Sequence, residues 1–427
     1  MIILLDLDGT LTNTTHPYFK NMKDGIDNTD VSLIRKYVFP NALTFIKKQI
    51  IKGNKLYIVS DSHPRYVEPI SKQIFDLPFL SLADKPNDKK TRDFIISNPE
   101  LNTAFQNKDD FIFVGDSWLD VALGRLLNIR TVLTKFYKTY VKEVRDGIGD
   151  DWRPIKEGPT YYAKNFKELS GIIDNPLKNL LALEAIFQGV ESSKAVKFKF
   201  QKYADGFTAF RCLARQEDGE CDKYAIADKY FQIDNPNRSI HFLEKLALSV
   251  SNYLKKVESK NMVKWDYLTY VSDKKTTNPP KKMEQIFDLI NSKITKIKLF
   301  HWSPNVEGNL RNHPNYNARR EFINKYLFTD KNFNLNGKNI IIIDDQFTSS
   351  ATAYEIATQL RNRGAKNILF VALFYLTLPL SNKDCPNCDR KMQIKINRQR
   401  GNKFYSCLSP IFGGNGCGHI INIVNEY

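Results

Sequence analysis

The first part of the chain alternates short apolar runs with longer amphipathic segments. The apolar runs predict strands at Ile2–Leu5, Lys55–Val59, Phe111–Val114, Thr131–Leu133 and Thr160–Ala163. Amphipathic segments such as Ala42–Ile51 and Val121–Leu127 lie between them and predict helices. Strands that alternate with helices are typical of a parallel sheet covered by helices. We therefore expect an α/β unit over residues 1–175.

The same alternation returns further along the chain. It predicts strands at Tyr267–Val271, Ile297–Trp302, Ile340–Ile343 and Ile368–Tyr375, and helices at His241–Val257 and Ala353–Arg363. The polar segment Ser272–Lys282 contains two prolines and predicts a loop. We expect a linker with a helix over residues 176–193, a second α/β unit over 194–380 and a small cysteine-bearing module over 381–427.

Polar residues follow three predicted strands of the first unit. They are Asp6-Leu7-Asp8-Gly9-Thr10, Ser60-Asp61 and Gly115-Asp116-Ser117. Because the carboxyl ends of parallel strands meet at one edge of a sheet, these carboxylates are expected to converge. Converging carboxylates repel each other unless a hard cation such as Mg²⁺ lies between them. A phosphate ester bound there would be open to in-line attack by a carboxylate.

These motifs resemble the haloacid dehalogenase (HAD) phosphohydrolase superfamily, in which D-x-D-G-T, a Ser or Thr, a Lys and G-D-x-x-x-D follow in order. The resemblance covers the first unit and implies a HAD-type Rossmann-like sheet. It implies that Asp6 is the nucleophile and Asp8 the general acid and base. The implied phosphate-binding residues are Thr10, Ser60 and Lys85, and the implied Mg²⁺ ligands are Asp6, Asp8, Asp116 and Asp120.

Two details of the first site follow from spacing. Lys89 and Lys90 lie close to Lys85 and are alternatives for its role. The segment from Ser60 to Lys85 is too short for a large cap domain, and Thr12–Phe39 leaves room only for a small helical insertion. We therefore expect an open site that admits a bulky substrate, such as a polynucleotide end, or that the second unit covers.

A second set of carboxylates follows the predicted strand Ile340–Ile343. The segment reads Asp344-Asp345-Gln346-Phe347-Thr348-Ser349-Ser350-Ala351-Thr352 and leads into a predicted helix. Backbone N–H groups at the start of a helix bind phosphate, and Thr348, Ser349, Ser350 and Thr352 add hydroxyl groups. Because Asp344 and Asp345 suit the hydroxyl groups of a ribose, the segment predicts a site for ribose 5-phosphate.

This segment resembles the phosphoribosyl pyrophosphate (PRPP) motif of type I phosphoribosyltransferases. Lys274 and Lys275 lie where that family has its pyrophosphate loop, and Asn317-Ala318-Arg319-Arg320 resembles the ComF-like branch. The resemblance implies that Asp344 and Asp345 are catalytic and that Mg²⁺ assists the departure of pyrophosphate. The family usually has Gly at the position of Ser350, which leaves catalysis or binding without turnover as alternatives.

Four of the six cysteines lie near the end of the chain. Cys385, Cys388, Cys407 and Cys417 predict a tetrahedral Zn²⁺ site. The segment resembles the zinc ribbons of bacterial type I topoisomerases, with His419 as an alternative ligand, and this implies contact with single-stranded nucleic acid. The residues implied in that contact are Lys395, Arg398, Arg400, Lys403, Phe404 and Tyr405. Cys212 and Cys221 stand apart and are expected to be ordinary thiols.

The net charge of +16 favours anionic partners, although a Lys-rich composition also explains it. The start MIILLDLDGT lacks the basic region and cleavage site of a signal peptide, and no apolar run reaches the roughly 20 residues that span a bilayer. We expect a cytoplasmic protein that binds PRPP and nucleotides, without a membrane partner. A homodimer or larger complex is one alternative for its assembly.

Three functions remain open from the sequence. The first is a bifunctional enzyme of nucleotide metabolism, in which a transferase joins a base to PRPP and a phosphatase removes a phosphate. The second is a nucleic-acid-associated effector of a stress or defence system, with the ribbon as its anchor. The third is a sensor that binds PRPP or a nucleotide without turnover.

Overall fold

The first sheet contains six parallel strands in the order β3-β2-β1-β4-β5-β6. These are β1 (Ile2–Leu5), β2 (Lys55–Val59), β3 (Phe79–Leu80), β4 (Phe111–Gly115), β5 (Arg130–Thr134) and β6 (Tyr161–Ala163). Their β-branched, aliphatic and aromatic residues suit a sheet that is buried on both faces. The five strands predicted in this unit are confirmed, each within one residue at either end.

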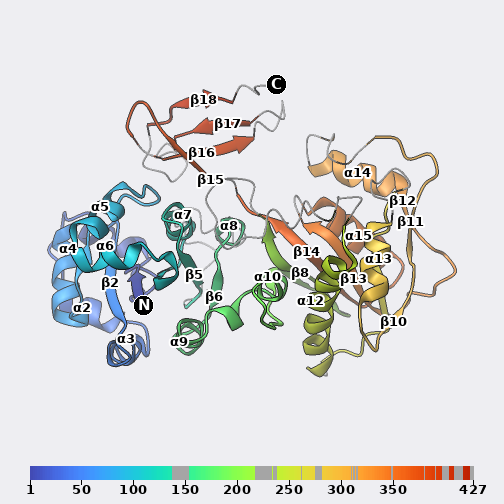
Figure 1. Cartoon of the computed structure of the whole chain (residues 1–427), viewed down its shortest axis with the longest axis horizontal. Helices are drawn as coiled ribbons and strands as arrows, with labels where there is room; N and C mark the ends of the chain where they lie inside the picture. The colour runs from blue at the N-terminus through green and yellow to red at the C-terminus, as the bar shows by residue number, and fades with distance from the viewer. Residues whose placement is uncertain are drawn as a thin grey trace.

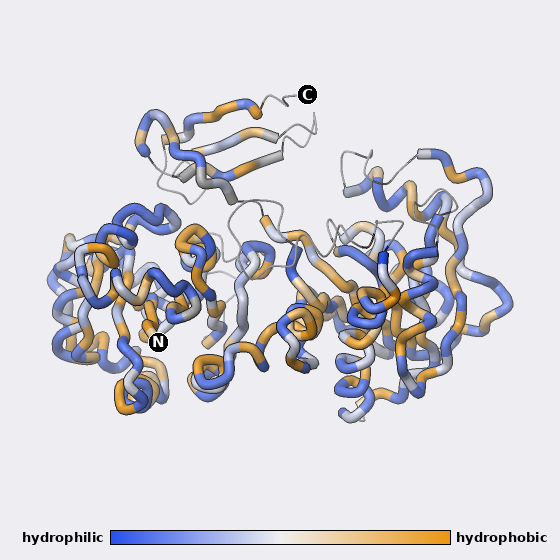
Figure 2. The backbone as a smooth tube through the Cα atoms, in the orientation of Figure 1, coloured by the Kyte–Doolittle hydropathy of each residue, from blue (hydrophilic) through white to orange (hydrophobic). Residues whose placement is uncertain are grey.

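Helices cover both faces of this sheet. They are α1 (Lys20–Lys23), α2 (Val31–Lys36), α3 (Ala42–Ile51), α4 (Pro64–Ile70), α5 (Lys89–Ser97), α6 (Pro99–Phe105), α7 (Trp118–Leu126), α8 (Arg153–Lys156) and α9 (Phe166–Asp174). Ile3 and Leu5 pack with α2, α3, α4 and α9, whereas Ile2 and Leu4 pack with α5, α6 and α7. Figure 2 shows how hydrophobic and hydrophilic residues alternate along these helices.

The second sheet has the order β10-β9-β13-β14-β8-β7, in which only the β7–β8 pair is antiparallel. Its strands are β7 (Val196–Lys202), β8 (Phe207–Gln216), β9 (Tyr267–Tyr270), β10 (Thr295–Lys296), β13 (Asn339–Phe347) and β14 (Asn367–Leu376). The surrounding helices are α10 (Ala182–Phe187), α12 (Ile240–Ser259), α13 (Lys282–Leu289), α14 (Tyr316–Tyr326) and α15 (Ala351–Asn362). The expected α/β class is therefore confirmed for both units.

Three element predictions in the second unit are wrong in part. Only Phe300–Trp302 of the expected strand Ile297–Trp302 is a strand, because the chain leaves the main sheet after β10 and forms β11 (Phe300–Trp302) against antiparallel β12 (Leu327–Thr329). The strand predicted at Ile340–Ile343 continues to Phe347, because the long apolar strand β14 offers backbone partners as far as Tyr375. The loop predicted to reach Lys282 ends earlier, since Lys282 begins α13.

The computed structural model describes residues 1–136, 153–216, 233, 238–260, 262–274, 281–308, 310, 313, 316–347, 350–378, 380–389, 391–396, 403–407 and 417–423. The last part forms an antiparallel sheet of β15 (Leu380–Asp384), β16 (Lys391–Ile396), β17 (Lys403–Ser406) and β18 (Ile420–Asn422). Figure 1 shows this small sheet above the region where the two α/β units meet. None of the helices that the model describes is long and apolar enough to cross a bilayer.

The two α/β units share a hydrophobic core. Val121, Leu133 and Ile155 of the first unit belong to the same buried cluster as Phe210 and Tyr375 of the second. Hydrogen bonds from side chains of the first unit to main-chain carbonyls of the second also cross this boundary. Arg125 donates to the carbonyl of Leu378 at 2.9 Å, and Lys156 donates to that of Leu376 at 2.8 Å. The boundary is therefore a packed interface with paired polar groups.

Candidate functional site

The first candidate site lies where the connections of the first sheet change direction. From β1 the chain moves outward to β2 and β3, and from β4 it moves the other way to β5 and β6. Ligands of open α/β sheets bind at such a switch point, outside the carboxyl ends of the two central strands. Asp6 directly follows β1 and Asp116 directly follows β4. The fold thus places both carboxylates at the crevice where a ligand is expected.

The second sheet has the same arrangement at a different place. From β9 the chain moves outward to β10, whereas from β13 it moves to β14 on the other side. The crevice therefore lies between the carboxyl ends of β9 and β13. Asp273 follows β9, while Asp344 and Asp345 lie within the carboxyl-terminal half of β13. Both motifs found in the sequence thus occupy switch points.

Three carboxylates gather at the first crevice. Oxygen atoms of Asp6, Asp116 and Asp120 all lie within 4.8 Å of one another. The three residues are buried, with exposed fractions of 5%, 6% and 1%. Lys85 inserts its ammonium group among them, and Nζ lies 2.7 Å from Oδ1 of Asp6 and 2.6 Å from Oδ1 of Asp120. Hard carboxylate oxygens so close together suit Mg²⁺, and the donor set fits this ion.

Burial controls the protonation of this group. Loss of solvent raises the pKa of Asp6 well above its usual value, and the ammonium group of Lys85 acts in the opposite direction. Burial alone would lower the pKa of Lys85, but Asp120, Asp6 and Asp61 outweigh it and raise that pKa well above its ordinary value. Lys85 is therefore a fixed positive charge beside the carboxylate of Asp6.

Asp120 is held in place by the start of α7. Its Oδ2 accepts from the N–H of Ser117 at 3.0 Å and from the Ser117 hydroxyl at 2.6 Å. Gly115 leaves the space that this arrangement needs, because a Cβ atom there would lie 2.2 Å from Cβ of Asp120. The glycine of the G-D-x-x-x-D motif is thus required by the close approach of the Asp120 side chain.

The carboxylate of Asp8 is held by hydroxyl groups. Oδ1 accepts from Thr14 at 2.5 Å and from Tyr66 at 3.0 Å, and Oδ2 accepts from Ser62 at 3.0 Å. Thr14, Ser62 and Tyr66 were not identified from the sequence. Ser62 lies two residues beyond the motif residue Ser60, but nothing in the local pattern of Tyr66 signals a partner 58 residues away.

Residues expected to bind phosphate lie around the same crevice. Thr10 donates through Oγ1 to Oδ2 of Asp6 at 3.4 Å, and Ser60 is buried at the end of β2. Of the three lysines that are candidates for the phosphate-binding role, Lys85 is the one that contacts the carboxylates of Asp6 and Asp120. Lys90 donates instead to the carbonyl of Leu82, and Lys89 lies exposed at the start of α5.

At the second crevice an ion pair joins the start of α13 to the carboxyl-terminal half of β13. Nζ of Lys282, which is 9% exposed, lies 2.6 Å from Oδ2 of Asp345. Asp344 is buried, and loss of solvent together with the charge of Asp345 raises its pKa well above the usual value. Oδ2 of Asp273 accepts from the N–H of Met283 at 2.9 Å, and burial raises its pKa to about 6. Lys282 was placed in a loop from sequence, and its partner lies 63 residues away.

The segment after β13 keeps one feature of a glycine-bearing loop. Ser350 has φ 63° and ψ 1°, the left-handed conformation that favours glycine, and it precedes α15. A glycine would adopt this backbone conformation without strain. Thr352 lies in the first turn of α15. The expected phosphate-binding residues Thr348, Ser349 and Lys275 lie outside the described residues.

The basic residues expected near this site lie in different surroundings. Nζ of Lys274 lies 4.7 Å from the centre of the Trp302 ring and 4.5 Å from that of Phe322. Arg320 forms an ion pair with Glu355 at 2.8 Å. The structure therefore places Lys274 over aromatic rings and brings Lys282 to the carboxylate of Asp345.

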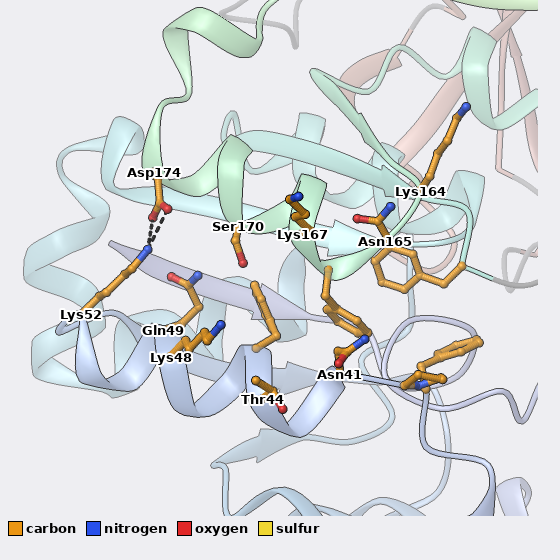
Figure 3. Close-up of a pocket in the computed structure, with 15 residues that line it drawn as sticks. Asn41, Thr44, Lys48, Gln49, Lys52, Lys164, Asn165, Lys167, Ser170 and Asp174 are labelled. Carbon is orange, nitrogen blue, oxygen red and sulfur yellow. Dashed lines mark hydrogen bonds and ion pairs between the residues drawn. The ribbon is translucent and has the colours of Figure 1, made fainter.

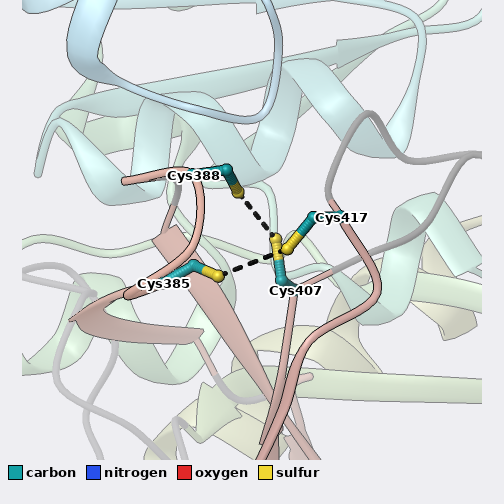
Figure 4. Close-up of side chains that lie close together, drawn as sticks. All are labelled: Cys385, Cys388, Cys407 and Cys417. Carbon is teal, nitrogen blue, oxygen red and sulfur yellow. Dashed lines mark hydrogen bonds between the residues drawn. The ribbon is translucent and has the colours of Figure 1, made fainter.

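The four C-terminal cysteines converge, as Figure 4 shows. Sγ of Cys385 lies 3.5 Å from that of Cys417, and Sγ of Cys388 lies 3.4 Å from that of Cys407. Four sulfur atoms within 4.8 Å of one another fit a tetrahedral Zn²⁺ site. His419 does not belong to this group, and its Nδ1 lies 3.3 Å from Nδ2 of Asn387.

Only part of the implied nucleic-acid surface can be placed. Phe404 and Tyr405 lie on β17 and are half-buried, and Nζ of Lys383 lies 4.8 Å from the centre of the Tyr405 ring. Arg398 and Arg400 lie outside the described residues, as does Cys221, and the side chains of Lys395 and Lys403 are likewise outside the description. Cys212 is fully buried in β8, as expected for a core thiol.

Several solved structures are similar to part of the chain. A HAD-like family hydrolase from Streptococcus pneumoniae is 14% identical with a TM-score of 0.27, and 40% of this chain covers 97% of it. A predicted phosphoglycolate phosphatase from Haemophilus somnus is 16% identical with a TM-score of 0.29, at the same coverage. A HAD-superfamily hydrolase from Ehrlichia chaffeensis is 13% identical with a TM-score of 0.26, and 40% of this chain covers 95% of it.

No family model matches the chain, and no curated protein matches it.

Proposed function

We propose that the N-terminal unit is a Mg²⁺-dependent phosphohydrolase of the HAD type that acts on phosphorylated small molecules. One observation carries this proposal. Asp6, Asp116 and Asp120, which are distant in sequence, converge with Lys85 at the switch point of a parallel sheet. Buried carboxylates in such a number are costly unless a cation and a positively charged side chain offset their charge.

The residues suggest a two-step reaction. A carboxylate oxygen of Asp6 attacks phosphorus while the bond to the ester oxygen breaks, and Asp8 gives a proton to the leaving oxygen. A water molecule then loses its proton to Asp8 and attacks the aspartyl-phosphate, which releases phosphate and restores Asp6. Lys85 would offset negative charge on the phosphoryl oxygens. Bound Mg²⁺, held by Asp6 and Asp116, would neutralise the phosphate group.

Phosphate release tests this proposal. The purified full-length chain is incubated with Mg²⁺ and a panel of nucleoside phosphates, PRPP and 5′-phosphorylated oligonucleotides. Asp6→Asn is expected to abolish release, whereas Asp93→Asn, which removes an exposed carboxylate of α5, is expected to retain it. Equal release by wild type and Asp6→Asn would overturn the proposed nucleophile.

We also propose that the second unit binds PRPP and acts as a type I phosphoribosyltransferase, which would make the chain a bifunctional enzyme. Support comes from Asp344 and Asp345 at the second switch point, and from Ser350, whose backbone has the left-handed conformation that favours glycine. The carboxylates would bind the ribose hydroxyl groups, and the start of α15 would face the 5′-phosphate. When the substrate binds, the ammonium group of Lys282 would leave Asp345 and pair with the pyrophosphate of the substrate.

Binding and turnover are separated by two measurements. PRPP is expected to raise the melting temperature of the wild type but not of an Asp344→Asn, Asp345→Asn double variant. Pyrophosphate release from PRPP, screened over nucleobases, tests transfer itself. Stabilisation without pyrophosphate release would favour the sensor over the transferase, and no stabilisation would contradict PRPP binding.

A further inference from the structure

A surface groove in the first unit lies apart from both candidate active sites. It encloses about 770 Å³ between α3 and α9. Figure 3 shows the two helices on either side of it, with Asn41 and Asn165 at one end and Lys52 and Asp174 at the other. A cavity of this size matches a small-molecule ligand such as a nucleotide.

The groove has a strong positive charge. Lys48 lines it from α3 and Lys52 directly follows that helix, while Lys164 precedes α9 and Lys167 lies in its first turn. Among the described residues, Asp174 is the only acidic residue that lines the groove. Asp174 pairs with Lys52 at 2.6 Å. The other three lysines form no ion pair with any residue that the model describes. Figure 3 shows the Lys164 side chain extending away from the groove, so the ammonium groups of Lys48 and Lys167 are left for an anion.

The floor of the groove carries a polar donor. Gln49 is fully buried, and its Oε1 accepts from Nδ2 of Asn54 at 2.7 Å, which sets the orientation of the amide. Its Nε2 has no hydrogen-bond partner among the described residues. A buried donor without a partner is unfavourable, so an acceptor oxygen on a ligand that reached this amide would be favoured. Gln49 is an observation independent of the surface lysines.

Both helices begin at the same end of the groove. Asn41 precedes α3 and Asn165 precedes α9, and the positive ends of the two helix dipoles therefore face one region. Next to this end the rings of Phe136 and Phe166 lie 4.5 Å apart, and Phe136 is only half-buried. The groove thus combines positive charge, amide donors and an aromatic surface.

We propose that this groove binds a nucleoside phosphate, either free or as the end of a single-stranded nucleic acid. The lysines and helix starts would bind the phosphate, Gln49 would donate to an oxygen, and the base would lie against the aromatic rings. The proposal does not depend on the phosphatase or transferase activities, because no residue of either candidate active site lines the groove.

Binding is measured by calorimetry on the full-length Asp6→Asn protein, which prevents turnover at the first site. The two probes are adenosine 5′-monophosphate and a 5′-phosphorylated oligothymidylate. A Lys48→Glu, Lys167→Glu double variant is compared with a Lys47→Glu, Lys178→Glu double variant. The control makes the same charge change at two exposed lysines that do not line the groove.

We expect the groove variant to weaken binding by more than about tenfold, because each lost charge-assisted hydrogen bond is worth at least about 1.4 kcal/mol. The control variant should bind as the parent does, and melting curves should show that both variants are folded. Binding of the monophosphate identifies a free nucleotide, and binding of the oligonucleotide alone identifies a nucleic-acid end. Failure of both probes, or equal loss in the two variants, would overturn the proposal.

Discussion

Lys85 and Asp120 form an ion pair of 2.6 Å in which both side chains are almost completely buried. The same ammonium group contacts Asp6 at 2.7 Å, so one lysine links the end of β1 to the start of α7. Since α7 continues to Arg125 at the boundary with the second unit, the pair also lies at one end of a structural connection between the two units.

Replacing Lys85 tests its role against that of its neighbours. Lys85→Met should lower phosphatase activity by about 10² or more, because it removes a fixed positive charge from the place where charge develops. Lys90→Met removes a lysine whose ammonium group contacts only a main-chain carbonyl in its described surroundings, and it should retain activity. Steady-state rates at saturating Mg²⁺ measure both. Loss of activity in Lys90→Met alone would assign the role to Lys90.

Metal binding at the first site predicts a stability effect that needs no substrate. A ligand at about 100 times its dissociation constant stabilises the folded state by about 2.7 kcal/mol. Millimolar Mg²⁺ should therefore raise the melting temperature of the wild type, and Asp116→Asn should reduce this shift. Asp93→Asn is the matched exposed control. If Asp116→Asn responds to Mg²⁺ as the wild type does, Asp116 is not a ligand.

Much of the first site followed from sequence because its residues come at strand ends. The strands Ile2–Leu5 and Lys55–Val59 were predicted to the residue, since buried parallel strands are short apolar runs. Residues that reach the sites from elsewhere could not be found in this way. Tyr66 reaches Asp8 from the first turn of α4, and Lys282 reaches Asp345 only because α13 begins where it does.

Local pattern also could not show which sheet a strand joins. The segment Ile297–Trp302 is apolar enough for one strand, yet Ile297 stays beside β9 while Phe300 pairs with Thr329 in a separate two-stranded sheet. The choice depends on which backbone groups lie nearby, a tertiary property. For the same reason the groove between α3 and α9 could not be foreseen, because its lining residues are spread from 39 to 174.

The cysteine cluster predicts about one equivalent of bound zinc per chain. Cys407→Ser should lose this metal, because three thiolates and a hydroxyl form a weaker site. Cys212→Ser changes a buried thiol in β8 outside the cluster and should keep the metal. Elemental analysis of protein purified without added metal measures both. Zinc retained in Cys407→Ser at the wild-type level would contradict the four-cysteine assignment.

Lys156 predicts how stability changes with pH. Burial lowers the pKa of Lys156 from 10.5 to about 8. Between these two values the unfolded chain binds more protons at this side chain than the folded chain, so stability should rise with pH in that window. The gain from this group is at most about 3 kcal/mol, since one pKa unit corresponds to about 1.4 kcal/mol.

The matched variant is Lys156→Met, which keeps an unbranched apolar side chain over the rings of Phe198 and Phe347. It should melt at a higher temperature than the wild type near neutral pH, and this advantage should shrink as the pH approaches about 10. Groups that titrate alike in both proteins contribute equally to the two curves of melting temperature against pH, and their contributions cancel in the difference. A constant difference over this range would show that Lys156 keeps an ordinary pKa.

Arg215 and Glu184 form an ion pair whose side chains are 0% and 1% exposed. Glu184 lies on α10, in the segment expected to be a linker, whereas Arg215 lies on β8 and also donates to the carbonyl of Gly158 in the first unit at 3.0 Å. Glu184→Gln should destabilise the protein by about 3 to 5 kcal/mol, because it leaves a buried guanidinium without its counter-charge.

The exposed pair Lys20–Asp24 supplies the control, and Asp24→Asn should cost less than about 1 kcal/mol. An Arg215→Met, Glu184→Leu double variant should recover much of the stability lost in Glu184→Gln, because no unpaired charge remains buried. Denaturant unfolding followed by tyrosine and tryptophan fluorescence measures all three. If Glu184→Gln were no more harmful than Asp24→Asn, water would have to reach this pair, and the interface between the units would be looser than the shared core indicates.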